Sequence, residues 1–147
     1  VVHFNGEEIQ LVHYPMGHTD TDTVVYFPKA KVMHTGDLFF NGYFPFIDIN
    51  GGGDVEQYMA NVQSLIDTTS EGVIIIPGHG SLASIDDLKA FHTLMGETVA
   101  IIRKGIDAGK TKEELQQEGL PERYANAGTG FVKTNRWISI VCDSYKR

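Results

Sequence analysis

The chain is predicted to fold as a mixed α/β (α+β) domain, with a mixed sheet covered by helices. Three observations predict this fold: two pairs of β-branched segments flank turn signals, one bare apolar run follows a helical segment, and helical periodicity dominates after residue 84. The 147 residues are the length of one ordinary domain, so we expect residues 1–147 to form a single domain.

Five segments are predicted strands because they are apolar or β-branched and are bounded by turn residues. Asn5-Gly6 is a strong hairpin signal, and Pro28-Lys29-Ala30 predicts a second tight turn. The last of the five is a bare apolar run, which is typical of a strand covered on both faces. The segments are Val1–Phe4, Glu8–Tyr14, Thr23–Phe27, Lys31–His34 and Val73–Ile76.

Four helices are predicted from apolar residues at helical spacing and from capping residues at their starts. Ser84, followed by two aspartates, begins the longest of them, and Thr111 with Glu114 forms a capping box. The expected helices cover Asp54–Asp67, Ser84 to about Lys104, a short segment after Thr111, and a last segment that begins at Thr134.

Composition excludes several classes of protein. The net charge of −7, with scattered Lys and Arg, argues against a nucleic-acid surface, and no apolar run is long enough to span a membrane. The single cysteine, Cys142, excludes an internal disulfide and a cysteine metal cage; we expect it to be a buried, inert thiol. No targeting segment is visible, and the compartment is not predicted.

Polar residues beside three of the predicted strands are expected to meet at one edge of the sheet. In an antiparallel hairpin the first strand begins where the second ends, so His18 and Asp37 lie at the same edge. A right-handed crossover through the helix after residue 54 makes the next strand parallel, which brings His79 to that edge as well. One such histidine alone is more often a surface residue, but histidine and carboxylate together are the ligands of a zinc-type centre. The other four histidines are expected to be packing or surface residues: His3, His13, His34 and His92.

Three short motifs carry a resemblance to a known family. Gly17-His18-Thr19-Asp20, Thr35-Gly36-Asp37-Leu38-Phe39 and Pro77-Gly78-His79-Gly80 resemble, in this order, three metal-ligand motifs of the metallo-β-lactamase superfamily. The resemblance implies an αββα sandwich. The family's first motif, H-x-H-x-D-H, appears nowhere in the 147 residues. The chain therefore resembles the C-terminal half of such a protein, half of the sandwich with the N-terminal half absent.

The resemblance implies a metal-dependent hydrolase. Its complete members hold two metal ions, with zinc expected here and manganese or iron as alternatives, and the ions generate a hydroxide that attacks the substrate. Asp37 would bridge the two metals as a catalytic residue, while His18 would bind the first metal and His79 the second. An aspartate at this position points to glyoxalase-II-like or broader hydrolases, with an ester, thioester, lactone or lactam of a small molecule as substrate. Since these three ligands belong to two metal sites, we expect the chain alone to bind metal weakly and to hydrolyse little or nothing.

Several alternatives stay open at this level. The chain could be an inactive structural or interaction module with the same fold, or a redox member that uses iron. The aromatic loop Phe39–Gly53 could form a substrate wall or a lid over the core, and Asp20 and Asp22 could orient His18 or cap a turn. A half-sandwich leaves a sheet face bare, so we expect a homo-oligomer or a complementing N-terminal half that covers it.

Overall fold

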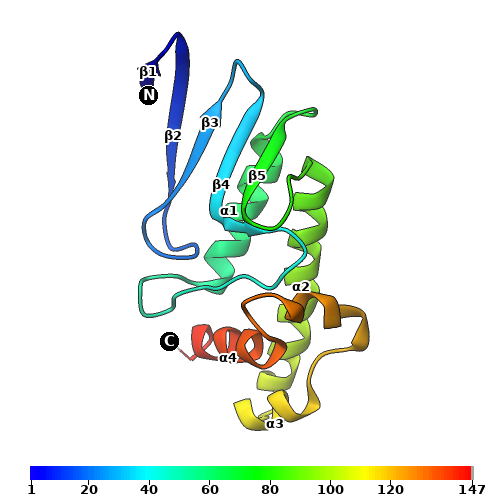
Figure 1. Ribbon diagram of the computed structural model, residues 1–147. Coiled ribbons are helices and arrows are strands. Elements are labelled where there is room, and N and C mark those ends of the chain that lie inside the picture. The colour runs from blue at the N-terminus through cyan, green and yellow to red at the C-terminus, as the bar shows by residue number, and fades with distance from the viewer. Residues whose placement is uncertain (147) are drawn as a thin grey trace.

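The computed structural model describes residues 1–146, in which five strands form one sheet in the order β1-β2-β3-β4-β5 (Figure 1). Neighbouring strands are antiparallel except β4 and β5, which are parallel. The mixed sheet predicted from the sequence is therefore confirmed. The strands are β1 (Val2–Phe4), β2 (Glu7–Tyr14), β3 (Asp22–Phe27), β4 (Val32–Phe40) and β5 (Ile74–His79).

Both predicted hairpins are present. Asn5 and Gly6 have φ angles of 50° and 77°, the left-handed pair that a two-residue hairpin turn requires. The second hairpin joins β3 to β4, with Val25 opposite His34. Local turn chemistry therefore favours the pairing of β1 with β2 and of β3 with β4.

β4 and β5 extend further than the sequence indicates. The prediction ended these strands at His34 and Ile76, with Asp37 and His79 beyond them, but both residues lie inside the strands as the structure has them. The parallel pairing continues past Gly36 with two shifts in register, and it ends where Phe40 pairs with His79. The sequence prediction stopped early because the glycines and the proline in these segments are typical of turns, whereas here they occupy an irregular stretch of paired strand.

The predicted helices are all present and are joined by one that was not predicted. Asp54 caps α1, while Ser84 and Thr111 cap α2 and α3 through reciprocal capping boxes. The 3-10 helix η1 was not predicted, because Pro121 precedes it and no side chain caps its start, so it lacks the capping signal of α1, α2 and α3. The helices are α1 (Val55–Thr68), α2 (Ile85–Asp107), α3 (Lys112–Glu118), η1 (Glu122–Thr129) and α4 (Thr134–Ser144).

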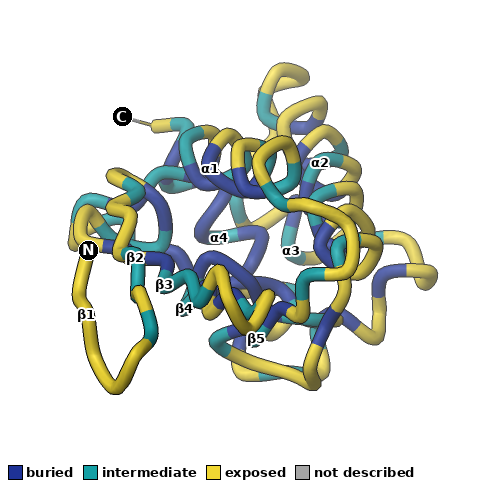
Figure 2. Tube along the Cα trace, turned by 90° about the horizontal axis from the view of Figure 1, so that it is seen from above, coloured by how far each residue is buried: buried dark blue, intermediate teal, exposed yellow. Residues whose placement is uncertain are grey.

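The helices and the buried residues lie on one side of the sheet (Figure 2). Ile75 on β5 faces the helices and is fully buried, whereas Ile74 is 50% exposed. The expectation that this strand is covered on both faces is therefore wrong, because no described segment packs on the other face. Cross-strand pairing puts apolar residues of four strands on that open face, among them Leu11, Val25, Phe27, Val32, Ile74 and Ile76.

The C-terminal helices are fixed to the body of the protein by a buried aromatic contact. The Trp137 indole N–H donates a hydrogen bond of 3.0 Å to Thr98 Oγ1 on α2, and the Phe44 ring stacks on Trp137 at 5.5 Å. The Phe44 backbone N–H also donates to the Ala127 carbonyl oxygen. The loop 41–53 therefore runs between the ends of the strands and α4 (Figure 1).

Two smaller sequence predictions are confirmed. Cys142 is buried, and burial raises the pKa of its thiol, so it is a packing residue. The four remaining histidines avoid the core, with His92 partly exposed and the others exposed: His3, His13 and His34. No helix in residues 1–146 has the length and apolar character that crossing a bilayer demands.

Replacing Thr98 with valine is expected to destabilise the fold by about 1–3 kcal/mol, because the buried Trp137 N–H would lose its acceptor. Urea denaturation measures this change in the free energy of unfolding. Thr93→Val is the matched control: Thr93 lies on the same helix, makes the same bond to the carbonyl four residues earlier, and is exposed. Equal losses in both variants would contradict the role given to the Trp137–Thr98 bond.

Candidate metal centre

The structure brings His18, Asp37 and His79 together at one edge of the sheet. His18 Nε2 lies 3.5 Å from Asp37 Oδ2, and His79 Nε2 lies 3.3 Å from Asp37 Oδ1. The two carboxylate oxygens therefore face different histidines. The sequence-based expectation that these side chains share one pocket agrees with this arrangement, whereas their binding of metal stays a prediction.

Asp22 holds His18 in its orientation. Its Oδ1 lies 3.4 Å from His18 Nδ1, which turns Nε2 toward Asp37, and its Oδ2 accepts a hydrogen bond of 2.5 Å from the His18 backbone N–H. The Thr19 hydroxyl donates to the same carboxylate. Asp22 thus caps the turn and orients the histidine at once. Asp20 makes only backbone contacts, since its N–H donates to Gly51 and its carbonyl oxygen bonds the His13 ring.

The pKa of His18 is raised above its ordinary value of 6.5. The hydrogen bond with Asp22 is the largest cause, partial burial opposes it, and the negative charges of Asp37, Asp22 and Asp48 raise the pKa further. The surroundings of His18 therefore favour a positive charge beside Asp37. A cation bound between the same groups would meet the same favourable field.

Glycine leaves the room that both carboxylates need. A Cβ atom on Gly17 would lie 2.4 Å from Asp22 Oδ2, and one on Gly78 would lie 2.4 Å from Asp37 Oδ1. Both distances are far below contact distance, so any other residue would displace the carboxylate. The glycines beside the polar residues are thus part of the site rather than simple turn signals.

Tyr58 is a buried residue that contacts the centre and that no sequence motif indicates. Its hydroxyl donates a hydrogen bond of 2.9 Å to the backbone carbonyl oxygen of Asp37. The side chain is fully buried on α1, where periodicity identified it only as a core residue. The bond ties the β4 backbone at Asp37 to α1.

Different residues of the aromatic loop Phe39–Gly53 take the two predicted roles, a lid over the core and a wall of the site. Phe39, Phe40 and Phe44 are buried, as expected for a lid over the core. Phe46 is half-buried and its ring lies 5.9 Å from the His18 ring, as expected for a wall of the site. Phe40 also contributes, since the His79 imidazole stacks on it at 4.5 Å.

The centre is open to solvent on one side. The His79 side chain is 54% exposed and that of Asp37 is 36% exposed, whereas that of His18 is 20% exposed. The side of His79 is therefore the more accessible side of the centre. The side of His18 is the less exposed side of the centre.

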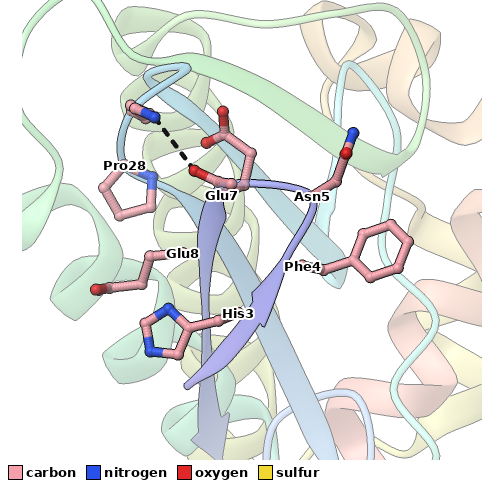
Figure 3. Close-up of a pocket in the computed structure, with 8 residues that line it drawn as sticks. His3, Phe4, Asn5, Glu7, Glu8 and Pro28 are labelled. Atoms are coloured by element: carbon pink, nitrogen blue, oxygen red, sulfur yellow. Dashed lines mark hydrogen bonds between the residues drawn. The ribbon is translucent and has the colours of Figure 1, made fainter.

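A hollow that is separate from the centre lies at the first hairpin. It has a volume of about 710 Å³ and is lined by residues that include His3, Phe4 and Glu7 (Figure 3). Lys29 Nζ donates to the Gly6 carbonyl oxygen at its border. None of the three predicted ligands lines it, so it is separate from the candidate centre.

The three predicted ligands do not by themselves form a closed metal site. Within residues 1–146, no group of three or more His, Cys, Asp or Glu side chains is arranged to hold a metal ion by itself. Two imidazole nitrogens and a carboxylate with one oxygen toward each are nevertheless ligands that suit zinc, manganese or iron.

Replacing Asp22 with asparagine is expected to lower the pKa of His18, because the variant removes the charged hydrogen-bond partner that is the largest cause of the increase. Asp37 and Asp48 still raise the pKa in the variant, and partial burial still lowers it. In the metal-free wild type, the pairing of His18 with Asp22 stabilises the fold. This stabilisation is fully present below pH 6.5, and it is lost as the pH rises through the raised pKa of His18 in the folded state. An NMR titration of the His18 ring protons measures the pKa in both proteins. Asp20→Asn is the control and should leave it unchanged; a shift of equal size there would exclude a specific role for Asp22.

A family profile described as the metallo-beta-lactamase superfamily matches residues 2–79, just over half of the chain. The match contains all three predicted ligands. Members of this superfamily are metal-dependent. Among curated proteins, an uncharacterized protein of Aquifex aeolicus is 30% identical over 97 residues, which are 66% of this chain and 45% of that protein.

Hydroxyacylglutathione hydrolase GloC of Haemophilus influenzae is 29% identical over 89 residues, 60% of this chain and 41% of its own length. The chain thus spans under half of the curated relatives it matches. Together with the superfamily match, this relative supports a hydrolase family.

Solved structures show the same fold. The DIM-1 metallo-beta-lactamase is 28% identical with a TM-score of 0.52, and the match covers 61% of this chain and 42% of that protein's chain. A metallo-beta-lactamase from Pontibacter korlensis is 20% identical with a TM-score of 0.56, covering 65% and 44%. A double mutant of the sec-alkyl sulfatase PisA1, 15% identical, covers 95% of this chain and 24% of its own with a TM-score of 0.72, so its fold also includes the C-terminal helices. From the profile match and the shared fold, the chain belongs to the metallo-beta-lactamase superfamily.

Proposed function

We propose that this chain supplies part of the metal centre of a hydrolase that cleaves an ester, thioester, lactone or lactam of a small molecule. The observation that carries the proposal is the Asp37 carboxylate, whose two oxygens face His18 Nε2 and His79 Nε2 separately. A carboxylate in this position can bridge two metal ions, with one histidine for each. Zinc is the metal that we favour, and manganese and iron suit the same donors.

Each residue of the centre has a distinct role in this proposal. Asp37 would bridge, His18 and His79 would each bind one metal, and Asp22 would keep His18 in the orientation for binding. When bound, the metal supplies a hydroxide at neutral pH and polarises the carbonyl that it attacks. The exposed side of His79 admits the substrate, and Phe46 limits it on the side of His18.

Three ligands divided between two metals leave each metal incompletely held. We therefore propose that the chain alone binds zinc weakly, and that a polypeptide carrying an H-x-H-x-D-H motif completes the centre. This would explain why residues 1–146 hold no self-sufficient metal group while the three side chains still converge.

Zinc titration by calorimetry, with and without a second polypeptide that carries the H-x-H-x-D-H motif, tests the proposal. We expect weak binding by the chain alone and stoichiometric binding with the second polypeptide. Hydrolysis of a panel of esters, thioesters, lactones and lactams should then appear only in the assembled protein. Tight stoichiometric binding by the chain alone would refute the division of ligands between two sites.

Asp37→Asn is expected to weaken zinc binding of the assembled protein more than about tenfold, because the amide cannot supply a charged bridge. Asp86→Asn is the matched control, since it removes the same charge from an exposed helical position remote from the centre. Calorimetry measures both affinities. If the two variants bound zinc alike, Asp37 would not be a ligand.

A structural or interaction module is the second candidate function. The absence of a complete metal group among residues 1–146 favours it. Metal analysis of the assembled protein separates the two candidates, because a module would contain no stoichiometric metal.

We also propose that the open face of the sheet is an association surface. It carries apolar side chains from four strands, among them Leu11 and Ile74, each about half exposed. Contiguous exposed apolar area of this kind drives protein association. In the absence of another polypeptide, a second copy of this chain is the occupant that we expect.

Light scattering at micromolar concentration should therefore give a mass about twice the 16.3 kDa of the monomer. Ile74→Lys should shift the protein toward monomer, because it puts a charge on the open face. Leu82→Lys is the control, as Leu82 is also apolar and exposed but lies outside the sheet. A stable monomer in the wild type would contradict this proposal.

A further inference from the structure

The C-terminal helical segment reaches the candidate metal centre through one aromatic ring. The Phe46 ring lies 5.9 Å from the His18 ring on one side, while the Arg136 guanidinium carbon lies 5.8 Å from the centre of the same ring. The Phe131 ring meets Phe46 edge-on at 6.3 Å. Residues more than a hundred positions apart in the sequence thus surround one ring beside a predicted ligand.

Arg136 is an unpaired cation within this group. Three arginines lie in the described residues 1–146; Arg103 pairs with Glu56, and Arg123 donates to the Tyr124 hydroxyl. Arg136 has neither an ion pair nor a hydrogen bond there, and its one contact is with the face of Phe46. Its five N–H donors are therefore free to bind a planar anion. The chain has a net charge of −7, so the unpaired positive charge of Arg136 is a local exception, and it favours a negative ligand.

Phe131 is exposed to an unusual degree for a residue in a fixed segment. Its side chain is 84% exposed, the highest value among the large apolar residues that the structure describes as exposed. The preceding residue is held tightly, because a Cβ atom on Gly130 would lie 2.8 Å from the Tyr43 ring. Trp137, one residue after Arg136, is fully buried and bonded to Thr98. The backbone that carries Phe131 and Arg136 is thus anchored on both sides, and the two side chains are presented to solvent.

We infer that Phe46, Phe131 and Arg136 form a subsite for an organic anion whose charged group is joined through a ring-sized apolar segment to the hydrolysable bond. The charged group would bind the Arg136 guanidinium, and the apolar segment would pack on Phe46 and Phe131. Because Phe46 touches both His18 and Arg136, a substrate that spans this ring reaches the metal centre with its other end. This inference rests on the proposed function and specifies its substrate class.

Phenylacetate, its neutral methyl ester and acetate separate the charge from the apolar contact. NMR titration of the metal-free protein follows the backbone amides of the three residues and the Arg136 side-chain N–H. Phenylacetate should give saturable shifts, and both the methyl ester and acetate should bind more weakly. Arg136→Gln should weaken phenylacetate binding about tenfold or more, and Phe131→Ala about threefold or more.

Lys104→Gln is the charge-matched control, because Lys104 is exposed on α2 and its side chain makes no ion pair in the described residues; its affinity should equal that of the wild type. Signals remote from the subsite report whether each variant is folded. Unchanged binding in Arg136→Gln, equal binding of the acid and its ester, or no binding of phenylacetate by the wild type would each overturn the inference.

The test needs no metal, so its result is independent of the proposed hydrolase centre. Asp37→Asn, which tests that centre, should bind phenylacetate at least as tightly as the wild type, because it removes a negative charge near the subsite. Loss of zinc binding with intact phenylacetate binding would leave the subsite in place without a hydrolase, and the reverse result would leave the hydrolase without this subsite.

Discussion

The parallel pairing of β4 with β5 beyond Gly36 is the constraint on which the candidate centre depends. It carries Asp37 and His79 side by side on adjacent strands, although 41 residues separate their neighbours Thr35 and Ile76, which are joined by a hydrogen bond. Such close approach of two backbones is compatible only with a missing side chain at Gly78. Helix α1 lies in the connection between β4 and β5, and its buried Tyr58 hydroxyl donates a hydrogen bond to the backbone carbonyl oxygen of Asp37. One packing arrangement thus fixes both the strands and the carboxylate.

A second layer of support comes from the C-terminal helices. Trp137 stacks on Phe44 and bonds to Thr98, so α4 is held against both α2 and the loop that follows β4. This loop brings Phe46 to His18, and α4 brings Arg136 to Phe46. The likeness to the β-lactamase structures covers 61–65% of the chain, whereas the likeness to the alkyl sulfatase covers 95%. The neighbours thus differ in how much of this chain their folds cover.

Burial and exposure divide the molecule into two functional sides. On the helix side the core is continuous and contains the aromatic anchors. The open face of the sheet carries apolar side chains such as Leu11 and Ile74, and this is the surface that a second sheet would cover. β5 was predicted to be buried on both faces, but within the described residues it is covered on only one. This is the main error of the prediction made from the apolar composition of the strand. A bare apolar run indicates a strand that is covered on both faces, but it does not indicate whether one chain supplies both covering layers.

The sequence by itself determined the hairpins, the capped helices and the three motifs, because turn chemistry, capping boxes and residue spacing are local properties. It also brought His18, Asp37 and His79 to one edge, since strand direction follows from the order of hairpin and crossover. Only the tertiary structure decided that Asp22 rather than Asp20 orients His18, that Phe46 alone of its loop's phenylalanines lines the His18 side, and that Arg136 joins them. Those facts depend on contacts between segments distant in sequence, where side-chain direction and packing, not periodicity, determine which atoms meet.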